Sequence, residues 1–371
     1  MFDTERSRTG RSVLGTFTLT FVAIAALFAI DTSLAKIERV EEHAGAARLF
    51  AEGQTLVQQG RYAEAAGRLN DAVAIERDNR DYRLGLAEAL TAAGRSTDAE
   101  DSLNELLQQD STDGAANLAM ARALIREGKT GEGISFYHRA IYGRWSAKPL
   151  ENRVRVRFEL VDLLARQNSK EDLLAELLPL QEEAPDDLAT RMRIGRLLIA
   201  AGSSPRAVEV FRAILRRHPQ DADAYAGLGE AEFARGNYQT AANEFFAASR
   251  LNAQDETIRG RLDLSNQVLA LDPTLRGLDT GERYRRSLKL LQLALDDAHQ
   301  CLGTPSPASQ ELWDEGSKAV KRRVAESRQN DATEENLDLA EQLWRARPRE
   351  CQTAPAATEN PLVLVLAKIG Q

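Results

Sequence analysis

A glycine that recurs every 34 residues constrains the fold more than any other feature of this 371-residue chain. Each of these glycines follows an apolar stretch with helical spacing, and a small residue stands five positions after it. The recurring glycines are Gly60, Gly94, Gly128, Gly202 and Gly236. A fixed period of this length is typical of proteins that stack equivalent structural units. Such stacks offer an extended surface, which favours the binding of other chains.

The positions around each glycine predict a pair of antiparallel helices. A small residue stands seven positions before the glycine and a large apolar one nine positions after it, as with Gly229 and Phe245 around Gly236. Small residues let two helices approach closely, and large ones fill the space that remains between them. Glycine adopts a positive φ without a Cβ clash, so it ends the first helix and lets the chain reverse. The apolar spacing of 3 and 4 is helical and not strand-like.

Over residues 46–255 this pattern resembles the tetratricopeptide repeat (TPR), a helix–turn–helix unit of 34 residues. The 74 residues between Gly128 and Gly202 hold one more unit and six additional residues. Asn168 stands where the glycine of that unit belongs, and asparagine tolerates the left-handed turn. The additional residues are expected in a loop over 142–149, which carries Trp145. The predicted fold is an all-α, TPR-like α-solenoid of about six helix–turn–helix repeats.

The sequence predicts three regions. Residues 1–35 form an N-terminal membrane anchor or signal peptide, and residues 36–255 form six TPR-like repeats with the insertion loop at 142–149. Residues 256–371 form a degenerate seventh helix pair and a helical C-terminal cap, because a stack needs its apolar end covered. The last apolar stretch, residues 362–369, is expected to dock on the cap helices. The alternative is that it lies in the protein's own groove.

The N-terminal region contains an uncharged, mostly apolar segment over residues 12–30. Its length is just sufficient for one crossing of a bilayer. Arg6, Arg8 and Arg11 precede it, so the chain is expected to have its N-terminus in the cytoplasm and its repeats outside. The segment is expected to stay as a transmembrane signal-anchor helix, or else to be cleaved after Ala35. The repeat domain is then anchored on the periplasmic side, or secreted to the periplasm.

Two cysteines and the net charge bear on compartment and partners. Cys301 and Cys351 are the two cysteines of the chain, and a pair in an exported protein usually forms a disulfide. Two buried free thiols are the alternative. The formal net charge is −8, which argues against a nucleic-acid partner because such a partner requires a basic stripe.

The sequence offers no constellation for catalysis. None of the four histidines forms a ligand pair at helical spacing. His299 with the two cysteines would supply three zinc ligands, but a fourth ligand and the usual spacing are missing. No serine stands in a G-x-S-x-G elbow, and no glycine-rich phosphate loop follows a strand. We therefore expect a protein that is not an enzyme and has no cofactor and no metal.

The resemblance to the TPR family implies that the first helix of each unit lines a concave face where ligands bind. Positions ten before each glycine would form an apolar floor, and positions six before it a polar rim. The predicted partner-binding groove comprises Phe50, Gln54, Leu84, Glu88, Leu118, Arg122, Phe158, Asp162, Met192, Arg196 and Glu230. Such a groove suits an extended or helical amphipathic segment. The chain lacks the lysine and asparagine with which co-chaperone members of the family hold a C-terminal carboxylate.

Two functions follow from these observations. The first is a non-enzymatic protein–protein interaction scaffold, displayed outside the cytoplasm, that binds a protein or peptide partner on its concave face. The second is a purely structural subunit or accessory domain of a cell-envelope assembly, without a peptide-binding groove. In that second case the apolar row only packs successive repeats together.

Overall fold

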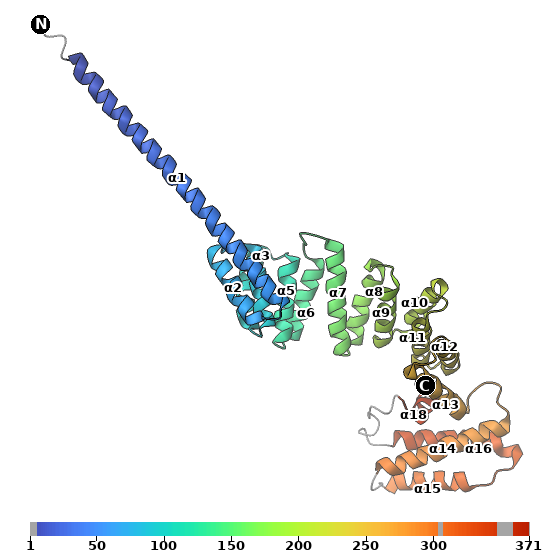
Figure 1. The fold of residues 1–371 in the computed structure, drawn as a ribbon. Helices are drawn as coiled ribbons and strands as arrows, with labels where there is room; N and C mark the ends of the chain where they lie inside the picture. Colours follow the sequence, from blue (N-terminus) through green and yellow to red (C-terminus); the bar gives the residue numbers. More distant parts are fainter. Residues whose placement is uncertain (1–5, 303–306, 347–358, 371) are drawn as a thin grey trace. The chain divides into compact units, whose positions relative to one another are not determined.

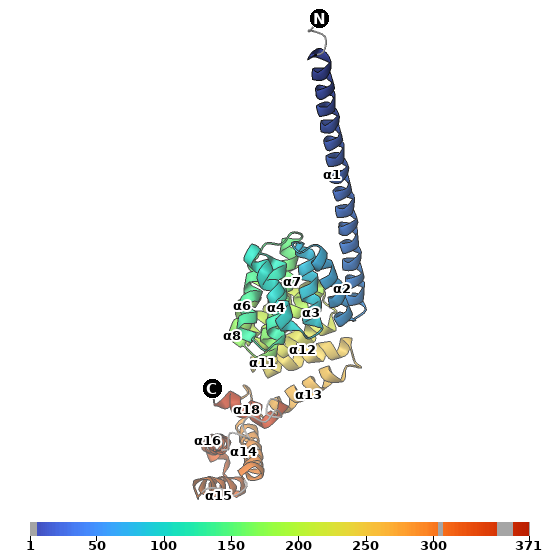
Figure 2. The same cartoon turned by 90° about the vertical axis from the view of Figure 1, so that its left-hand side faces the viewer.

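The computed structural model describes residues 6–302, 307–346 and 359–370 (Figures 1 and 2). Within these ranges every regular element is a helix, and one isolated bridge between Asp113 and Arg144 is the only β-type pairing. The predicted all-α repeat fold is therefore confirmed. The chain divides into two compact units, residues 1–160 and 161–371.

The first unit contains six whole helices and the beginning of a seventh. They are α1 (Arg6–Gln58), α2 (Tyr62–Ile75), α3 (Arg80–Ala92), α4 (Ser96–Gln109), α5 (Gly114–Arg126), α6 (Thr130–Tyr142) and the first part of α7 (Pro149–Arg166). Helices that follow one another from α1 to α6 pack together in order, and α3 and α5 also contact each other. The first helices of successive repeats thus form one layer.

The second unit continues the repeats and then changes to longer helices. After the end of α7 come α8 (Lys170–Glu183), α9 (Leu188–Ala200), α10 (Ser204–Arg217), α11 (Ala222–Ala234), α12 (Tyr238–Leu251) and α13 (Glu256–Leu271). The remaining elements are α14 (Thr280–Leu302), α15 (Pro307–Lys321), the short 3₁₀ helix η1 (Glu326–Arg328), α16 (Gln329–Arg345) and α18 (Pro361–Ile369).

The turn inside each repeat has the conformation that the glycine period predicts. The five recurring glycines have φ between +74° and +82°, and Asn168 has φ +55°. The residue after each turn donates its N–H to a carbonyl five positions earlier, as from Lys129 to Leu124 at 2.9 Å and from Ser169 to Leu164 at 3.1 Å. This is the Schellman end of an α-helix. The prediction of a repeat unit that turns at Asn168 is confirmed.

Small and large residues face each other inside the repeats. The Phe211 ring is fully buried and lies against the backbones of Gly195 on α9 and Gly227 on α11. A Cβ on Gly195 would come within 2.6 Å of the Phe211 ring, and one on Gly227 within 2.3 Å. Because a real Cβ does not approach this closely, these two positions require glycine for helix packing.

A second 34-residue period, which the sequence analysis missed, governs where helices begin. Five helices of the repeats start after an asparagine or aspartate whose side chain accepts a backbone N–H. These N-cap residues are Asn79, Asp113, Asp187, Asp221 and Asp255. Each cap satisfies an N–H that otherwise has no partner in the helix, which stabilises the protein by about 1 kcal/mol.

The insertion loop lies where the sequence predicts it, between the end of α6 and the start of α7. The Trp145 indole N–H donates to the Ala140 carbonyl at 2.9 Å, and its ring lies so close to Gly114 that a Cβ there would come within 2.5 Å. The Arg144 N–H donates to the Thr112 carbonyl at 2.7 Å. The loop is therefore pinned to the start of α5.

Helix α1 is continuous from Arg6 to Gln58, so the apolar N-terminal segment and the first helix of the first repeat are one element. Only its C-terminal part joins the solenoid, through residues such as Ala46 and Gly53 that face α2. Among the residues that the structure describes, no helix has both the length and the apolarity to cross a bilayer.

The C-terminal helices share one core with the last repeats. Leu362, Val365 and Leu366 of α18 are buried in the cluster that α13, α14 and α16 form. The Lys368 ammonium lies 2.5 Å from the buried Asp272 carboxylate at the end of α13. The final apolar stretch therefore docks on this region. Cys351 and the side chain of Cys301 lie outside the described residues, so their disulfide stays a prediction.

Candidate binding site

Helices from three successive repeats surround a cavity of about 490 Å³ in the first unit. Its lining comes from α3, α5, α6 and α7. The residues that line it are Glu88, Thr91, Ala92, Ala119, Arg122, Ile125, Arg126, Tyr137 and Glu159. Glu88 and Arg122 are members of the predicted polar rim, each six positions before the glycine of its repeat. The cavity thus lies along the first helices of the repeats.

One wall of the cavity is a fixed charged network. The Arg122 guanidinium donates two hydrogen bonds to the Glu159 carboxylate, both at 2.8 Å, and the Tyr137 hydroxyl donates a third at 2.7 Å. Burial opposes ionisation of Glu159, but the hydrogen bonds from these three donor groups outweigh burial and hold the pKa of its carboxyl below the usual value. Bidentate arginine–carboxylate pairs have a defined geometry, so this network orients α5 relative to α7.

The opposite wall presents a carboxylate without a partner. No hydrogen bond or ion pair joins Glu88 to any residue in the described ranges. Desolvation by the surrounding cavity raises the pKa of the Glu88 carboxyl, and the charges of Arg122 and Arg155 only partly oppose this. Glu88 remains exposed, so it is an acceptor open to a ligand.

Aliphatic groups also line the cavity, beside these charged side chains. Ala92, Ala119 and Ile125 contribute aliphatic groups, and Ala119 is buried. Arg126 donates a long hydrogen bond of 3.4 Å to the Ala92 carbonyl, which ties α5 to the end of α3. The cavity can therefore hold a small aliphatic group next to a hydrogen-bond donor or a cation.

The predicted apolar row lies deeper than the polar rim in the first unit. Leu118 is 4% exposed, and Phe50 stacks on Tyr82 with 4.7 Å between ring centroids. Leu84 and Phe158 are half-buried, whereas Gln54 on α1 is exposed. The open surface in this unit is therefore formed by the rim positions.

In the second unit the predicted rim residues are already paired. Three ion pairs account for them: Asp162 with Arg193 at 2.5 Å, Arg196 with Asp223 at 3.8 Å, and Glu230 with Arg261 at 2.5 Å. Met192, from the predicted floor, is buried. These three rim residues are thus paired within the chain.

A cavity of about 810 Å³ lies where α18 meets the last repeat. Arg261 is one of the residues that line it, and it binds Glu230 through two hydrogen bonds and stacks over Phe233, 4.2 Å from the ring centroid. Leu364 and Lys368 of α18 line the other side. The final helix therefore borders a predicted groove residue, Glu230, as well as docking on the C-terminal helices.

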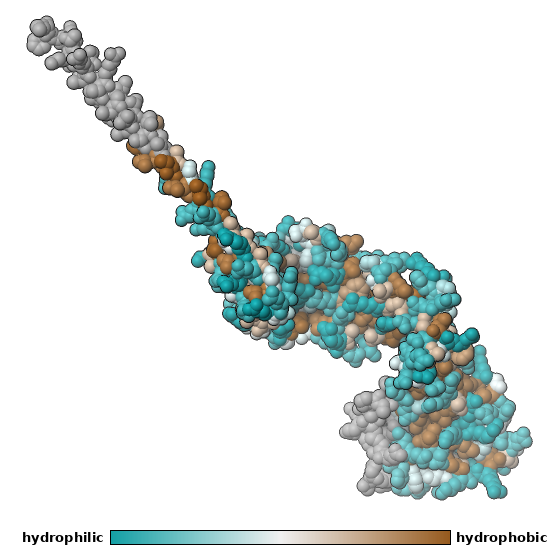
Figure 3. Space-filling model, viewed as in Figure 1, coloured by the Kyte–Doolittle hydropathy of each residue, from teal (hydrophilic) through white to brown (hydrophobic). Residues whose placement is uncertain are grey.

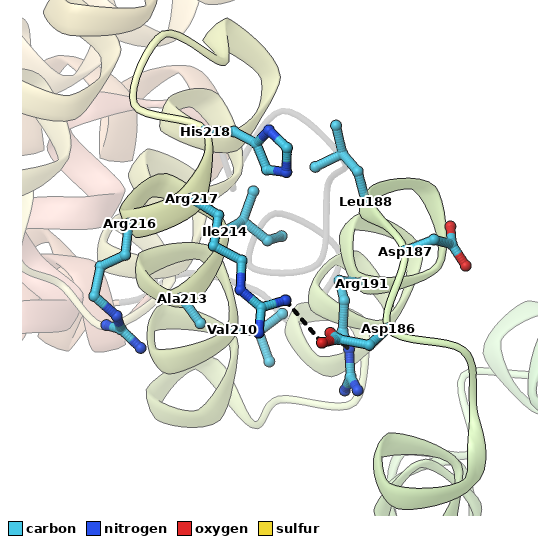
Figure 4. Close-up of a pocket in the computed structure, with 10 residues that line it drawn as sticks. All are labelled: Asp186, Asp187, Leu188, Arg191, Val210, Ala213, Ile214, Arg216, Arg217 and His218. Carbon is cyan, nitrogen blue, oxygen red and sulfur yellow. Dashed lines mark hydrogen bonds and ion pairs between the residues drawn. The ribbon is translucent and has the colours of Figure 1, made fainter.

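A smaller cavity of about 290 Å³ lies between α10 and the start of α9 (Figure 4). The Asp186 carboxylate accepts hydrogen bonds from Arg217 at 2.7 Å and Arg191 at 2.9 Å, and these two arginines lower the pKa of its carboxyl. Asp187 points away from the cavity and caps α9. Because Asp186, Arg191 and Arg217 satisfy one another, these three charges offer a ligand less than Glu88 does.

Metal chemistry finds no support at any of these places. Within residues 6–302, 307–346 and 359–370, no three histidine, cysteine, aspartate or glutamate side chains form a group that could hold a metal ion.

These features define a helical-repeat scaffold with a polar cavity on the layer of first helices. The chain contains tetratricopeptide repeats: models of this repeat match residues 56–123 and 192–256. Proteins with this fold are typically non-enzymatic scaffolds for protein interaction. The expected TPR assignment is confirmed.

Relatives match this chain over parts of their own length. Superkiller complex protein 3 of Mus musculus is 36% identical over 94 residues, which cover 25% of this chain and 6% of that protein. The putative cellulose synthase operon protein C of Escherichia coli O157:H7 is 22% identical over 324 residues, which cover 87% of this chain and 27% of that protein. The chain thus spans about a quarter or less of the curated relatives it matches.

Two solved TPR structures are also similar. The C-terminal part of a TPR repeat-containing protein from Cytophaga hutchinsonii has 12% identity and a TM-score of 0.47, and the match covers 64% of this chain and 92% of that one. YrrB, described as a TPR protein with an unusual peptide-binding site, has 17% identity and a TM-score of 0.41, and the match covers 53% of this chain and 97% of that one.

Two residues of the cavity network escaped prediction. Tyr137 stands nine positions after Gly128, where the repeat pattern predicts a large core residue, and no pattern in the sequence gives Glu159 a role. The partner of Arg122 depends on how α5 packs against α7. The insertion loop between these helices adds six residues to the 34-residue spacing, so the period does not indicate which residue of α7 faces Arg122. The one available signal is that Glu159 follows the predicted groove residue Phe158 on the same helix.

Proposed function

We propose that this chain is a protein–protein interaction scaffold that binds an extended segment of a partner in the cavity of its first unit. The open carboxylate of Glu88, opposite the fixed Arg122–Glu159 pair, is the observation that carries the proposal. The half-buried Arg122–Glu159 pair is already satisfied and has little to gain from a ligand, whereas the exposed carboxylate of Glu88 can accept a charge-assisted hydrogen bond.

The cavity chemistry defines the segment that it accepts. A lysine, an arginine or a backbone N–H of the partner donates to Glu88, and a small aliphatic side chain packs against Ala119 and Ile125. The opposite wall is held by three hydrogen bonds before any ligand arrives. Preorganisation of this kind reduces the entropic cost of binding.

We further propose that the repeats are displayed outside the cytoplasm, on the periplasmic side, by an N-terminal membrane helix. The support is the sequence: an uncharged apolar segment over residues 12–30 follows three arginines, and basic residues favour the cytoplasmic side. A reporter enzyme fused after Gln371 tests this proposal. Activity of a periplasm-specific reporter supports it, and activity of a cytoplasm-specific reporter contradicts it.

A second function, that of a structural subunit of an envelope assembly, has support in the second unit. There the predicted rim residues are paired within the chain, and α18 borders the last of them, Glu230. On this proposal the second unit makes permanent contacts through its outer surfaces, while its groove positions bind nothing.

A peptide array probed with the full-length chain separates the two functions. Binding to basic segments should weaken at least tenfold in Ala119→Phe, because the ring fills the cavity, and also in Glu88→Gln. The matched control is Asp101→Asn, which removes an exposed carboxylate from the outer helix α4. Equal binding by all three variants, with unchanged circular dichroism, would assign the interaction to another surface.

A further inference from the structure

The part of α1 that precedes the solenoid, residues 27–40, carries an exposed apolar stripe. We call these residues the neck. Leu27, Ile30, Leu34 and Ile37 are each between 57% and 66% exposed, although none is polar. Apolar surface is visible along this part of the helix in Figure 3. Four large aliphatic side chains in a row on one helix indicate an interaction surface.

The spacing of the stripe is that of a coiled-coil seam. The steps between its members are 3, 4 and 3 residues, which place Leu27 and Leu34 at heptad position a and Ile30 and Ile37 at position d. In the sequence the same register continues towards the N-terminus with small residues, at Thr16, Thr20 and Ala23. Small residues at this spacing are typical of contacts between helices in lipid.

The chain's own repeats do not cover the stripe. Helix α1 faces α2 with Ala46 and Gly53. At 3.6 residues per turn, the centre of the stripe is rotated by about 130° from that packing face. The stripe therefore points away from the solenoid, and the repeats of the same chain leave it exposed.

The charges beside the stripe favour a second copy in parallel orientation. In a parallel pair, position e of one helix meets position g of the other. Asp31 and Glu38 occupy e, and the uncharged Ala26, Ser33 and Val40 occupy g, so no like charges meet. An antiparallel pair would instead bring the carboxylates at e towards each other across the seam.

We propose that copies of this chain associate in parallel through their necks, with Leu27, Ile30, Leu34 and Ile37 at the seam. The partner is a second copy because the stripe is self-complementary and the parallel arrangement places its acidic e positions opposite uncharged g positions. Association brings the first units of the copies together and presents the Glu88 cavity more than once. Linked sites raise the apparent affinity for a multivalent partner without any new contact. The association itself does not depend on the proposed function.

Light scattering on the full-length chain in detergent tests the proposal, with the bound detergent subtracted. The wild type should have a protein mass that is a multiple of the 40.9 kDa chain. The double variant Leu34→Glu/Ile37→Glu should fall to a single chain. The matched control Thr32→Glu/Ala35→Glu adds the same charge on the outer face of the same helix segment and should keep the wild-type mass.

Cysteine crosslinking gives an independent readout in membranes. Leu34→Cys should form a covalent product between two differently tagged copies. Arg39→Cys, at heptad position f, should give no more crosslinked product than the wild type, in which the two native cysteines set the background yield. A single-chain mass for the wild type would overturn the proposal. So would an oligomer that survives Leu34→Glu/Ile37→Glu, or a Leu34→Cys product that joins one copy to a different protein.

Discussion

Replacing Gly195 by alanine should destabilise the second unit, although alanine is the better helix former. Gly195 lies in the middle of α9, and a Cβ there would come within 2.6 Å of one Phe211 ring atom and 3.0 Å of two others. The ring has no room to move away because it is fully buried and Gly227 lies against it as well. The backbones of α9 and α10 must therefore separate.

The net change in the free energy of unfolding caused by Gly195→Ala follows from two opposing effects. Overpacking of a well-packed core costs about 1–3 kcal/mol. Replacing glycine by alanine inside a helix gains about 0.8–1 kcal/mol. The difference leaves Gly195→Ala less stable than the wild type by about 1 kcal/mol.

Urea unfolding of the full-length chain, followed by circular dichroism, measures this difference. Gly260→Ala is the matched control, because Gly260 is an exposed position on α13 with no atom within 4 Å of its would-be Cβ. The control should gain about 0.8–1 kcal/mol. If Gly195→Ala were stabilised as much as the control, the small–large packing argument would be refuted.

A double variant isolates the contact itself. Phe211→Leu shortens the side chain that meets Gly195, so it should relieve part of the cost of Gly195→Ala. The double variant should be more stable than the sum of the single variants predicts, by at least about 0.5 kcal/mol. Strict additivity would mean that the two residues do not compete for the same space.

Three further predictions concern the turns, a cap and the cavity. Asn168→Val should lose about 1–2 kcal/mol because a β-branched residue is strained at φ +55°, whereas Asn168→Gly should unfold at the same or a higher urea concentration. Asp113→Asn should cost about 1 kcal/mol at pH 7. Burial opposes ionisation of Asp113, but Arg80 and two backbone N–H groups outweigh burial and lower the pKa of its carboxyl. The difference in free energy of unfolding between the wild type and Asp113→Asn, measured by urea unfolding at a series of pH values, should therefore vanish as the pH falls through that lowered pKa. Binding of a basic segment, measured by fluorescence anisotropy, should weaken as the pH falls through the raised pKa of Glu88, and Glu88→Gln should bind weakly without that pH dependence.

The repeats were predictable because each is determined by a few local residues. The glycine period located the turns, and Asn168 located the one turn without glycine, since both depend on the φ of a single residue. The insertion loop followed from counting residues between Gly128 and Gly202.

The contacts that close the cavity and the C-terminus were not predictable in the same way. The Arg122–Glu159 pair depends on the path of an irregular loop, and the Lys368–Asp272 pair joins residues 96 positions apart. Neither belongs to the period, so their partners are fixed by tertiary packing that no local pattern encodes. The N-cap period was readable from the sequence, because Asn79 and Asp113 stand 15 positions before their glycines.

Hydrogen exchange of the full-length chain tests the central proposal most directly, with and without a basic segment selected on the peptide array. Slower exchange is expected at the C-terminal halves of α3 and α5, which line the cavity with Glu88 and Arg122, and this change should be absent in Ala119→Phe. Protection confined to the outer helices α2 and α4, or to the second unit, would contradict binding in this cavity.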